Sequence, residues 1–146
     1  MKYFIVDIPP ANYVSTRYIS ELFPNKKIFK ARPFADFEEY RHEILEADVV
    51  WLLPQQMDLL PENFFEFGLS ISTLGEMTEG QIAKYLNNFE RLINGYLYIK
   101  QWHVSHNPFD KMKIDDIQKY SKRSWEKMYL RTVKSNSEFF ESIHKV

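Results

Sequence analysis

The chain has 146 residues, of which 45% are hydrophobic, enough for one domain with a single core. Its formal net charge of −1 argues against a nucleic-acid-binding surface, and the absence of cysteine excludes disulfides and thiolate metal sites. No apolar run approaches the roughly 20 residues that a membrane-spanning helix needs, and the N-terminus lacks a signal-peptide pattern, so we expect a cytoplasmic protein without a membrane partner.

The first part of the chain alternates short apolar segments with amphipathic ones. Residues 3–7 predict a buried strand, because the apolar run is too short for a helix and two prolines follow it. Those prolines can open a helix over residues 11–24. Its apolar positions recur at helical spacing: Val14, Tyr18, Ile19 and Leu22. Residues 26–32 and 48–54 predict two more strands, with a helix that begins near Asp36 between them.

The middle of the chain continues this alternation. A fourth strand is expected near residues 67–72. The clearest helix follows it, because Thr78 and Gln81 have the spacing of a capping box, in which each side chain satisfies an otherwise unpaired backbone N–H. The dipeptide Asn-Gly at residues 94–95 predicts that this helix ends there, at a residue in the left-handed backbone conformation.

The last part changes character. Residues 96–102 predict a fifth strand, and a polar, loop-like segment follows it. Residues 125–133 and 138–146 predict a hairpin. Strands that alternate with helices indicate an α/β, Rossmann-like fold, with a mainly parallel sheet, helices on both faces and an antiparallel C-terminal hairpin. We expect one domain over residues 1–146.

Ligands of such sheets bind beyond the carboxyl ends of the strands. This rule selects four places: Asp7, residues 54–56, residues 72–76 and residues 100–103. Asp7 could instead cap the helix that follows it. Glu76 could likewise be a carboxylate stabilised by the N-terminus of the next helix.

Several segments together resemble a known family. They are VDIPPANYVSTRYISELFPNKKIF, LLPQQMDLLP, SISTLGEMTEGQIAKYL, GYLYIKQW and HNPFD. They are similar to the sugar O-methyltransferase family, which has the fold of class I S-adenosylmethionine-dependent methyltransferases. The resemblance implies S-adenosylmethionine as cofactor and a sugar or another small-molecule hydroxyl as acceptor.

The resemblance also implies roles for the cofactor-binding residues. Asp7, at the end of its strand, matches the acid that accepts hydrogen bonds from the ribose hydroxyls of the cofactor. Gln55 lies where the family contacts adenine, although an exposed loop amide is the alternative. Ser72 lies beside the position of the transferred methyl group.

On the acceptor side, the resemblance implies that Glu76 and His103 are catalytic and that Lys100 and Trp102 bind substrate. Glu76 stands where related enzymes carry a histidine–aspartate pair, so it could be a base, a metal ligand or an acceptor for a sugar hydroxyl. Trp102 could stack on a sugar ring or belong to the core. His103 and His106 have H-x-x-H spacing, but without further context this is a weak metal signal, and we predict no metal site.

One part of the family pattern is missing from the sequence. Class I enzymes have a glycine-rich loop after their first strand, whereas the four glycines of this chain include no G-x-G arrangement. We therefore expect a C-terminal portion of a methyltransferase, with two unpaired sheet edges and with weak or no cofactor binding on its own. A second polypeptide or self-association could complete the sheet. The alternative function is a non-catalytic protein- or glycan-binding remnant of the fold.

Overall fold

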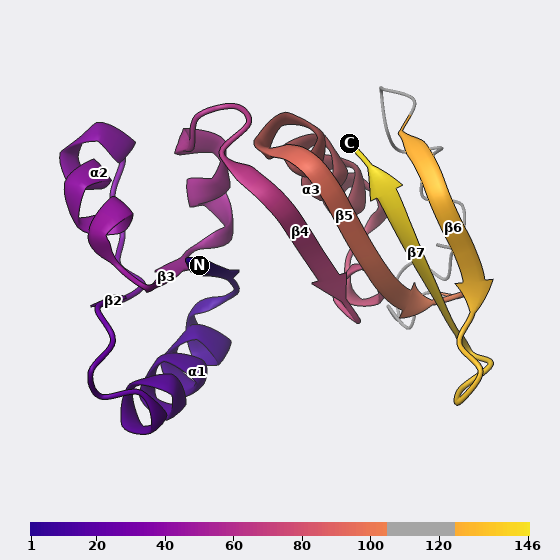
Figure 1. The fold of residues 1–146 in the computed structure, drawn as a ribbon, viewed down its shortest axis with the longest axis horizontal. Coiled ribbons are helices and arrows are strands. Elements are labelled where there is room, and N and C mark those ends of the chain that lie inside the picture. The colour runs from indigo at the N-terminus through magenta and orange to yellow at the C-terminus, as the bar shows by residue number, and fades with distance from the viewer. Residues whose placement is uncertain (105–124) are drawn as a thin grey trace. The chain divides into compact units, whose positions relative to one another are not determined.

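The computed structural model describes residues 1–104 and 125–146. Most of the polar segment predicted after the fifth strand, including His106, lies outside the described residues. The chain forms two compact units, Met1–Leu60 and Pro61–Val146, each built from strands and helices (Figure 1). No described helix has the length and apolar character needed to cross a membrane.

The first unit contains a small parallel sheet. Its elements are β1 (Tyr3–Val6), α1 (Pro9–Leu22), β2 (Ile28–Phe29), α2 (Phe37–Glu46), β3 (Val49–Leu52) and the 3₁₀ helix η1 (Pro54–Leu59). The strand order is β1-β3-β2, and both pairings are parallel, as the alternation of elements predicts. β2 is only two residues long, much shorter than predicted.

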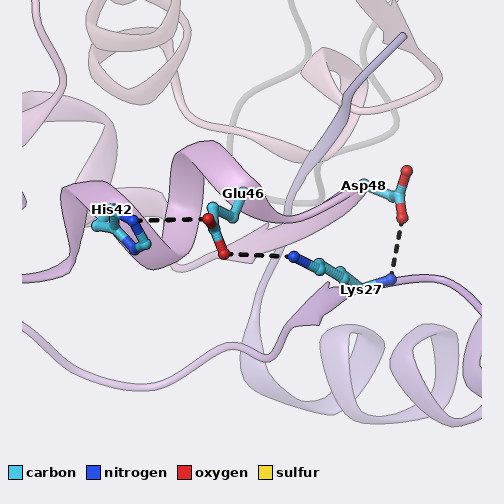
Figure 2. A network of polar contacts seen from close by, with 4 residues as sticks. All are labelled: Lys27, His42, Glu46 and Asp48. Carbon is cyan, nitrogen blue, oxygen red and sulfur yellow. Dashed lines mark hydrogen bonds and ion pairs between the residues drawn. The ribbon is translucent and has the colours of Figure 1, made fainter.

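Polar contacts of Asp48 hold the short strand β2 beside β3 (Figure 2). The Asp48 carboxylate accepts a hydrogen bond from the Lys27 backbone N–H at 3.0 Å, and the Asp48 N–H donates to the Lys27 carbonyl at 2.8 Å. The hydrogen bonds that the carboxylate accepts from the Lys27 N–H and from the Lys26 ammonium lower the pKa of Asp48. Glu46 pairs with Lys27 and His42 at the surface, where ion pairs contribute little to stability.

Helix α1 differs from the amphipathic helix that its sequence predicts. Val14, Tyr18 and Leu22 are 67%, 62% and 53% exposed, so the predicted apolar stripe lies largely in solvent. The helix contacts β3 through small polar residues instead, since the Ser15 hydroxyl accepts a hydrogen bond from the Trp51 indole N–H at 2.9 Å. The prolines do open the helix, as predicted.

The second unit contains a four-stranded mixed sheet. Its elements are β4 (Phe65–Ile71), the 3₁₀ helix η2 (Leu74–Glu76), α3 (Glu79–Leu92), β5 (Ile93–Trp102), β6 (Glu126–Thr132) and β7 (Phe139–Lys145). The strand order is β4-β5-β7-β6. β4 and β5 are parallel, whereas β7 runs antiparallel to both of its neighbours. The predicted α/β fold, with parallel strands and a C-terminal hairpin, is therefore confirmed, although the strands form two sheets.

Helix α3 begins as predicted but ends differently. Thr78 and Gln81 form the capping box, with the Thr78 N–H donating to Gln81 Oε1 at 2.9 Å. The prediction that the helix ends at residues 94–95 with a residue in the left-handed conformation is wrong. Both residues belong to β5, and no described glycine has a positive φ. Gly95 allows a close approach instead: a Cβ there would lie 2.2 Å from the Glu66 carbonyl oxygen.

The core of the second unit lies between its sheet and α3. It consists of Leu74, Ile82, Leu86, Ile93, Leu97, Ile99, Trp125 and Phe140. Side chains alternate along β4 and β5, so the residues between these core positions point to the other face. On that face Phe67, Leu69, Ile71 and Tyr96 are all 46–52% exposed.

Candidate functional site

Asp7 follows directly after β1, at the carboxyl end of the first sheet. Its backbone N–H donates to the Leu52 carbonyl at 3.3 Å, which ties it to the end of β3. Its side chain is exposed, and Oδ1 accepts a hydrogen bond from the Ile8 N–H at 2.8 Å. Ile8 is the N-cap residue of α1, and no side chain caps that helix. The carboxylate therefore faces solvent and retains acceptor capacity.

The side chain of Asn12, in the first turns of α1, links the ends of β1 and β3. Its side-chain amide donates to the Asp7 carbonyl at 2.7 Å and to the Leu52 carbonyl at 3.1 Å. The residue is 2% exposed, and its Oδ1 is buried without a hydrogen-bond partner among the described residues. Asn12 thus fixes the backbone that carries Asp7. Sequence reasoning missed this residue; its only signal was a polar residue one turn after a strand-ending Asp-x-Pro.

The two glutamines after β3 have different environments. Gln56 is 1% exposed, accepts a hydrogen bond from the Leu53 N–H at 2.7 Å and donates one to the Arg32 carbonyl at 2.9 Å. Gln55, the predicted adenine contact, is exposed in η1. The structure therefore assigns Gln56 to the architecture of the loop and leaves the amide of Gln55 at the surface.

In the second unit, Gln101 of β5 organises the loop that follows β4. Gln101 is fully buried, and its Oε1 accepts a hydrogen bond from the Leu74 N–H at 3.2 Å. Its Nε2 donates to the Ser70 hydroxyl at 3.1 Å, and that hydroxyl lies 2.9 Å from the Thr73 hydroxyl. This network fixes both ends of the turn that contains Ser72. Gln101 belongs to the YIKQW segment, but its role depends on contacts that sequence spacing does not reveal.

Ser72 and Glu76 lie in this fixed loop. Ser72 has φ of 57°, a left-handed conformation that is uncommon for residues other than glycine, and its N–H donates to the Lys100 carbonyl at 2.9 Å. Strained backbone of this kind is often found at functional sites. Glu76 ends η2 and is exposed. The loop therefore presents one carboxylate and one half-buried hydroxyl.

The residues at the end of β5 lie on different sides of the sheet. Strand alternation places Lys100 and Trp102 on the same face, where the Trp102 ring lies tilted against Phe139 with 4.0 Å between centroids, and Trp102 also packs against the edge of the core cluster. The Lys100 ammonium lies 5.8 Å from the centre of the same Phe139 ring. His103 instead contacts the hairpin: its Nε2 lies 3.3 Å from the Thr132 hydroxyl.

A charged cluster lies further along the face that carries Lys100. The Tyr98 hydroxyl donates to Glu141 at 2.7 Å, and the Arg131 guanidinium donates to the same carboxylate at 2.5 Å. Burial and the Glu141 carboxylate raise the pKa of Tyr98 to about 12, while the hydrogen bonds from Tyr98 and Arg131 lower the pKa of Glu141. Both groups therefore keep fixed protonation states at neutral pH.

The predicted site residues thus fall into two sets, Asp7 with Gln55 in the first unit and the rest in the second. Within the second unit, backbone pairing brings Ser72 to Lys100, and Phe139 brings Lys100 to Trp102. Among the described residues, no group of three histidine, aspartate or glutamate side chains could hold a metal ion.

Comparisons with known proteins identify the fold. No family model and no curated protein matches the sequence. Among solved structures, the PH0226 protein of Pyrococcus horikoshii OT3 aligns with a TM-score of 0.56 at 9% identity, over 99% of this chain and 81% of that protein. The 1,6-didemethyltoxoflavin-N1-methyltransferase of Burkholderia thailandensis, solved with S-adenosylhomocysteine, aligns with a TM-score of 0.54 at 11% identity, over 98% of this chain and 70% of the enzyme. The chain therefore has the Rossmann-like fold of S-adenosylmethionine-dependent methyltransferases.

Proposed function

We propose that the chain is the C-terminal portion of an S-adenosylmethionine-dependent O-methyltransferase that acts on a sugar hydroxyl. The observation that carries this proposal is the match between its fold and a methyltransferase structure that contains S-adenosylhomocysteine. The sugar acceptor rests on the sequence resemblance, chiefly the GEMT and YIKQW segments.

The residues around Asp7 suit one part of the cofactor. An exposed carboxylate at the carboxyl end of a parallel strand can accept hydrogen bonds from two neighbouring hydroxyl groups, such as those of a ribose. Each such charge-assisted bond is worth about 1.5–3 kcal/mol. Asn12 holds the Asp7 backbone in place, and the exposed amide of Gln55 is available to an adenine ring.

The loop after β4 and the end of β5 would form the acceptor side. When bound, S-adenosylmethionine supplies an electrophilic methyl group. Glu76 would accept the proton of the attacking hydroxyl, and the Gln101 network would keep the Glu76 loop in position, since alignment contributes much of the rate in such displacements. Ser72 would border the cofactor in this loop. Lys100 and Trp102, which lie on the same face of the sheet, would contact the sugar, with Trp102 offering its half-buried ring, whereas His103 lies on the other side, beside the hairpin.

The sequence lacks the glycine-rich turn that would bind the methionine part of the cofactor. A glycine-rich turn permits close backbone approach there, and the four glycines at positions 68, 75, 80 and 95 do not form one. We therefore expect the isolated chain to bind S-adenosylmethionine weakly and to be inactive until another polypeptide supplies the loop.

Calorimetric titration with S-adenosylhomocysteine tests this proposal. We expect millimolar or weaker binding to the isolated chain, reduced further by Asp7→Ala and unchanged by Glu39→Ala, an exposed acid of α2. Micromolar binding would contradict the expected incompleteness. Equal binding by the two variants would exclude the ribose role of Asp7. Finding a strand followed by G-x-G-x-G in the DNA upstream of Met1 would supply the missing partner for a methyl-transfer assay.

The second candidate function is a non-catalytic protein- or glycan-binding module. The apolar face of the second sheet favours it, because Phe67, Leu69, Ile71 and Tyr96 are each about half exposed there. Absence of any upstream glycine loop, together with no detectable cofactor binding, would favour this function over the first.

A further inference from the structure

The loop after β3 fixes the backbone of Gln55 from both sides. Pro54 precedes Gln55, and its ring fixes the backbone angle φ at the start of η1. Gln56 follows Gln55 and is 1% exposed, whereas Gln55 itself is exposed. The backbone at Gln55 is therefore held in place, while its side-chain amide lies in solvent.

Gln56 connects the ends of two neighbouring strands of the first sheet. Its Oε1 accepts a hydrogen bond at 2.7 Å from the N–H of Leu53, the residue directly after β3. Its Nε2 donates at 2.9 Å to the carbonyl of Arg32, in the segment that follows β2. Because the amide is buried, any other orientation would leave polar groups unpaired. Loop η1 therefore takes its position from the segment after β2 as well as from β3.

The Arg32 side chain extends this connection to helix α2. Its guanidinium lies 4.4 Å from the centre of the Phe29 ring and 4.9 Å from the centre of the Tyr40 ring, and it forms an ion pair with Glu43. Phe29 is fully buried at the end of β2, and Tyr40 and Glu43 belong to α2. A cation held against two rings and a carboxylate has few alternative positions. The contacts Glu43–Arg32–Gln56 thus connect α2 to loop η1, all within the first unit.

We propose that Gln56 and Arg32 are positioning residues for an adenine nucleoside, which hold Gln55 where its amide pairs with the edge of the adenine ring. The inference rests on the proposed function, in which Gln55 is available to adenine. Both residues act through Gln55 without touching the ligand, since both polar atoms of the Gln56 amide are used and Arg32 acts through its carbonyl and its packing on α2. A loop that is already fixed loses little freedom on binding, so these contacts raise the affinity for the base.

The ratio of the affinities for adenosine and purine riboside tests this role. Purine riboside has the same ribose and lacks only the amino group of adenine, so the ratio reports the contact with the base. NMR titration of the full chain with each nucleoside, up to about 10 mM, measures millimolar dissociation constants. We expect the wild type to prefer adenosine by about three- to tenfold, the value of one hydrogen bond. Gln55→Ala should bring the ratio close to one.

Three further variants separate positioning from direct contact. Arg32→Met keeps the length of the side chain and removes the guanidinium, and Gln56→Met removes both hydrogen bonds; each should bring the ratio to within about twofold of one although Gln55 is intact. The matched control is Arg41→Met, which removes another surface arginine of the first unit, paired with Glu38 at 3.1 Å, and should retain the wild-type ratio. Added to Gln55→Ala, Gln56→Met should lower the ratio no further, because a residue that acts through another has no effect once that residue is removed.

The outcomes distinguish this inference from the proposed function. If Gln56→Met does not fold, Arg32→Met decides the matter, because its side chain is 40% exposed and its loss is tolerated more easily. A purely structural role would change stability and the affinity for both nucleosides alike, and an unchanged ratio would therefore overturn the positioning role alone. An equal loss of the ratio in Arg41→Met would also overturn it. A wild type that shows no preference would overturn the adenine contact of the proposed function, and the positioning role with it.

Discussion

Replacing Gly95 by alanine tests the contact between the two parallel strands of the second sheet. The new Cβ would lie 2.2 Å from the Glu66 carbonyl oxygen, and ordinary van der Waals contact begins at 3.4 Å, so about 1.2 Å (3.4 − 2.2) of movement is needed. The obstructing atom is backbone, so no side-chain rotation relieves the clash. The strands must separate where their register shifts, between Phe65 and Phe67.

The size of the effect follows from two opposing contributions. Overpacking of a tight contact costs about 1–3 kcal/mol. Alanine also lowers the conformational entropy of the unfolded chain, which stabilises the folded state by about 0.4–1 kcal/mol. This gain applies here because Gly95 does not have a positive φ. We expect a net loss of about 1–2 kcal/mol, which lowers Tm by roughly 3–6 °C for a protein of this size.

Thermal unfolding followed by circular dichroism measures this loss, with Gly80→Ala as the matched control. Gly80 lies in the first turn of α3, and a Cβ there meets nothing within 4 Å. Because alanine favours helix, this control should gain up to about 0.5–1 kcal/mol. If Gly95→Ala is as stable as the wild type, the strands can separate without cost and the close-approach argument is wrong.

Three further substitutions probe the buried polar groups and the core of the second unit. Burial lowers the pKa of His144 from its usual 6.5 to about 4; the unfolded chain therefore binds the extra proton first, and stability should fall by roughly 1–3 kcal/mol as the pH drops from 7 to 4.5. Urea titrations should show that His144→Gln flattens this dependence, whereas His42→Gln, at an exposed site, retains it. Gln101→Leu leaves the buried Leu74 N–H unpaired and should cost about 1–3 kcal/mol, and faster proteolysis at residues 72–76 should accompany it; unchanged cleavage would exclude the positioning role. Phe140→Ala should cost about 3–5 kcal/mol, since the side chain is fully buried, and a loss under 1 kcal/mol in the same titration would contradict the assigned core.

Local sequence signals predicted most of the fold. The capping box at Thr78, the prolines that open α1 and the hairpin all depend on neighbouring residues, and each is present. The signals failed where a neighbour in space decides the outcome. Asn-Gly at residues 94–95 would end a helix in isolation, but the β4 pairs on either side, Phe65 with Ile93 and Phe67 with Tyr96, keep both residues in β5.

Burial was harder to predict than secondary structure. The apolar stripe of α1 predicted a buried face, yet Val14 and Tyr18 are exposed and the helix packs through Asn12 and Ser15. Periodicity shows that a face is apolar without showing what covers it. For the same reason the sequence identified the exposed acids Asp7 and Glu76 but missed Asn12 and Gln101, whose importance lies in contacts with distant backbone groups.

The position of β7 inside the second sheet constrains the order of assembly during synthesis. β7 lies between β5 and β6, although both of them precede it in the chain. Until residue 145 has left the ribosomal exit tunnel, β5 and β6 have no bridge, and the core around Phe140 stays open to water. A nascent chain in which β7 is not yet available therefore exposes this part of the core, and a chain cut before β7 cannot close the sheet.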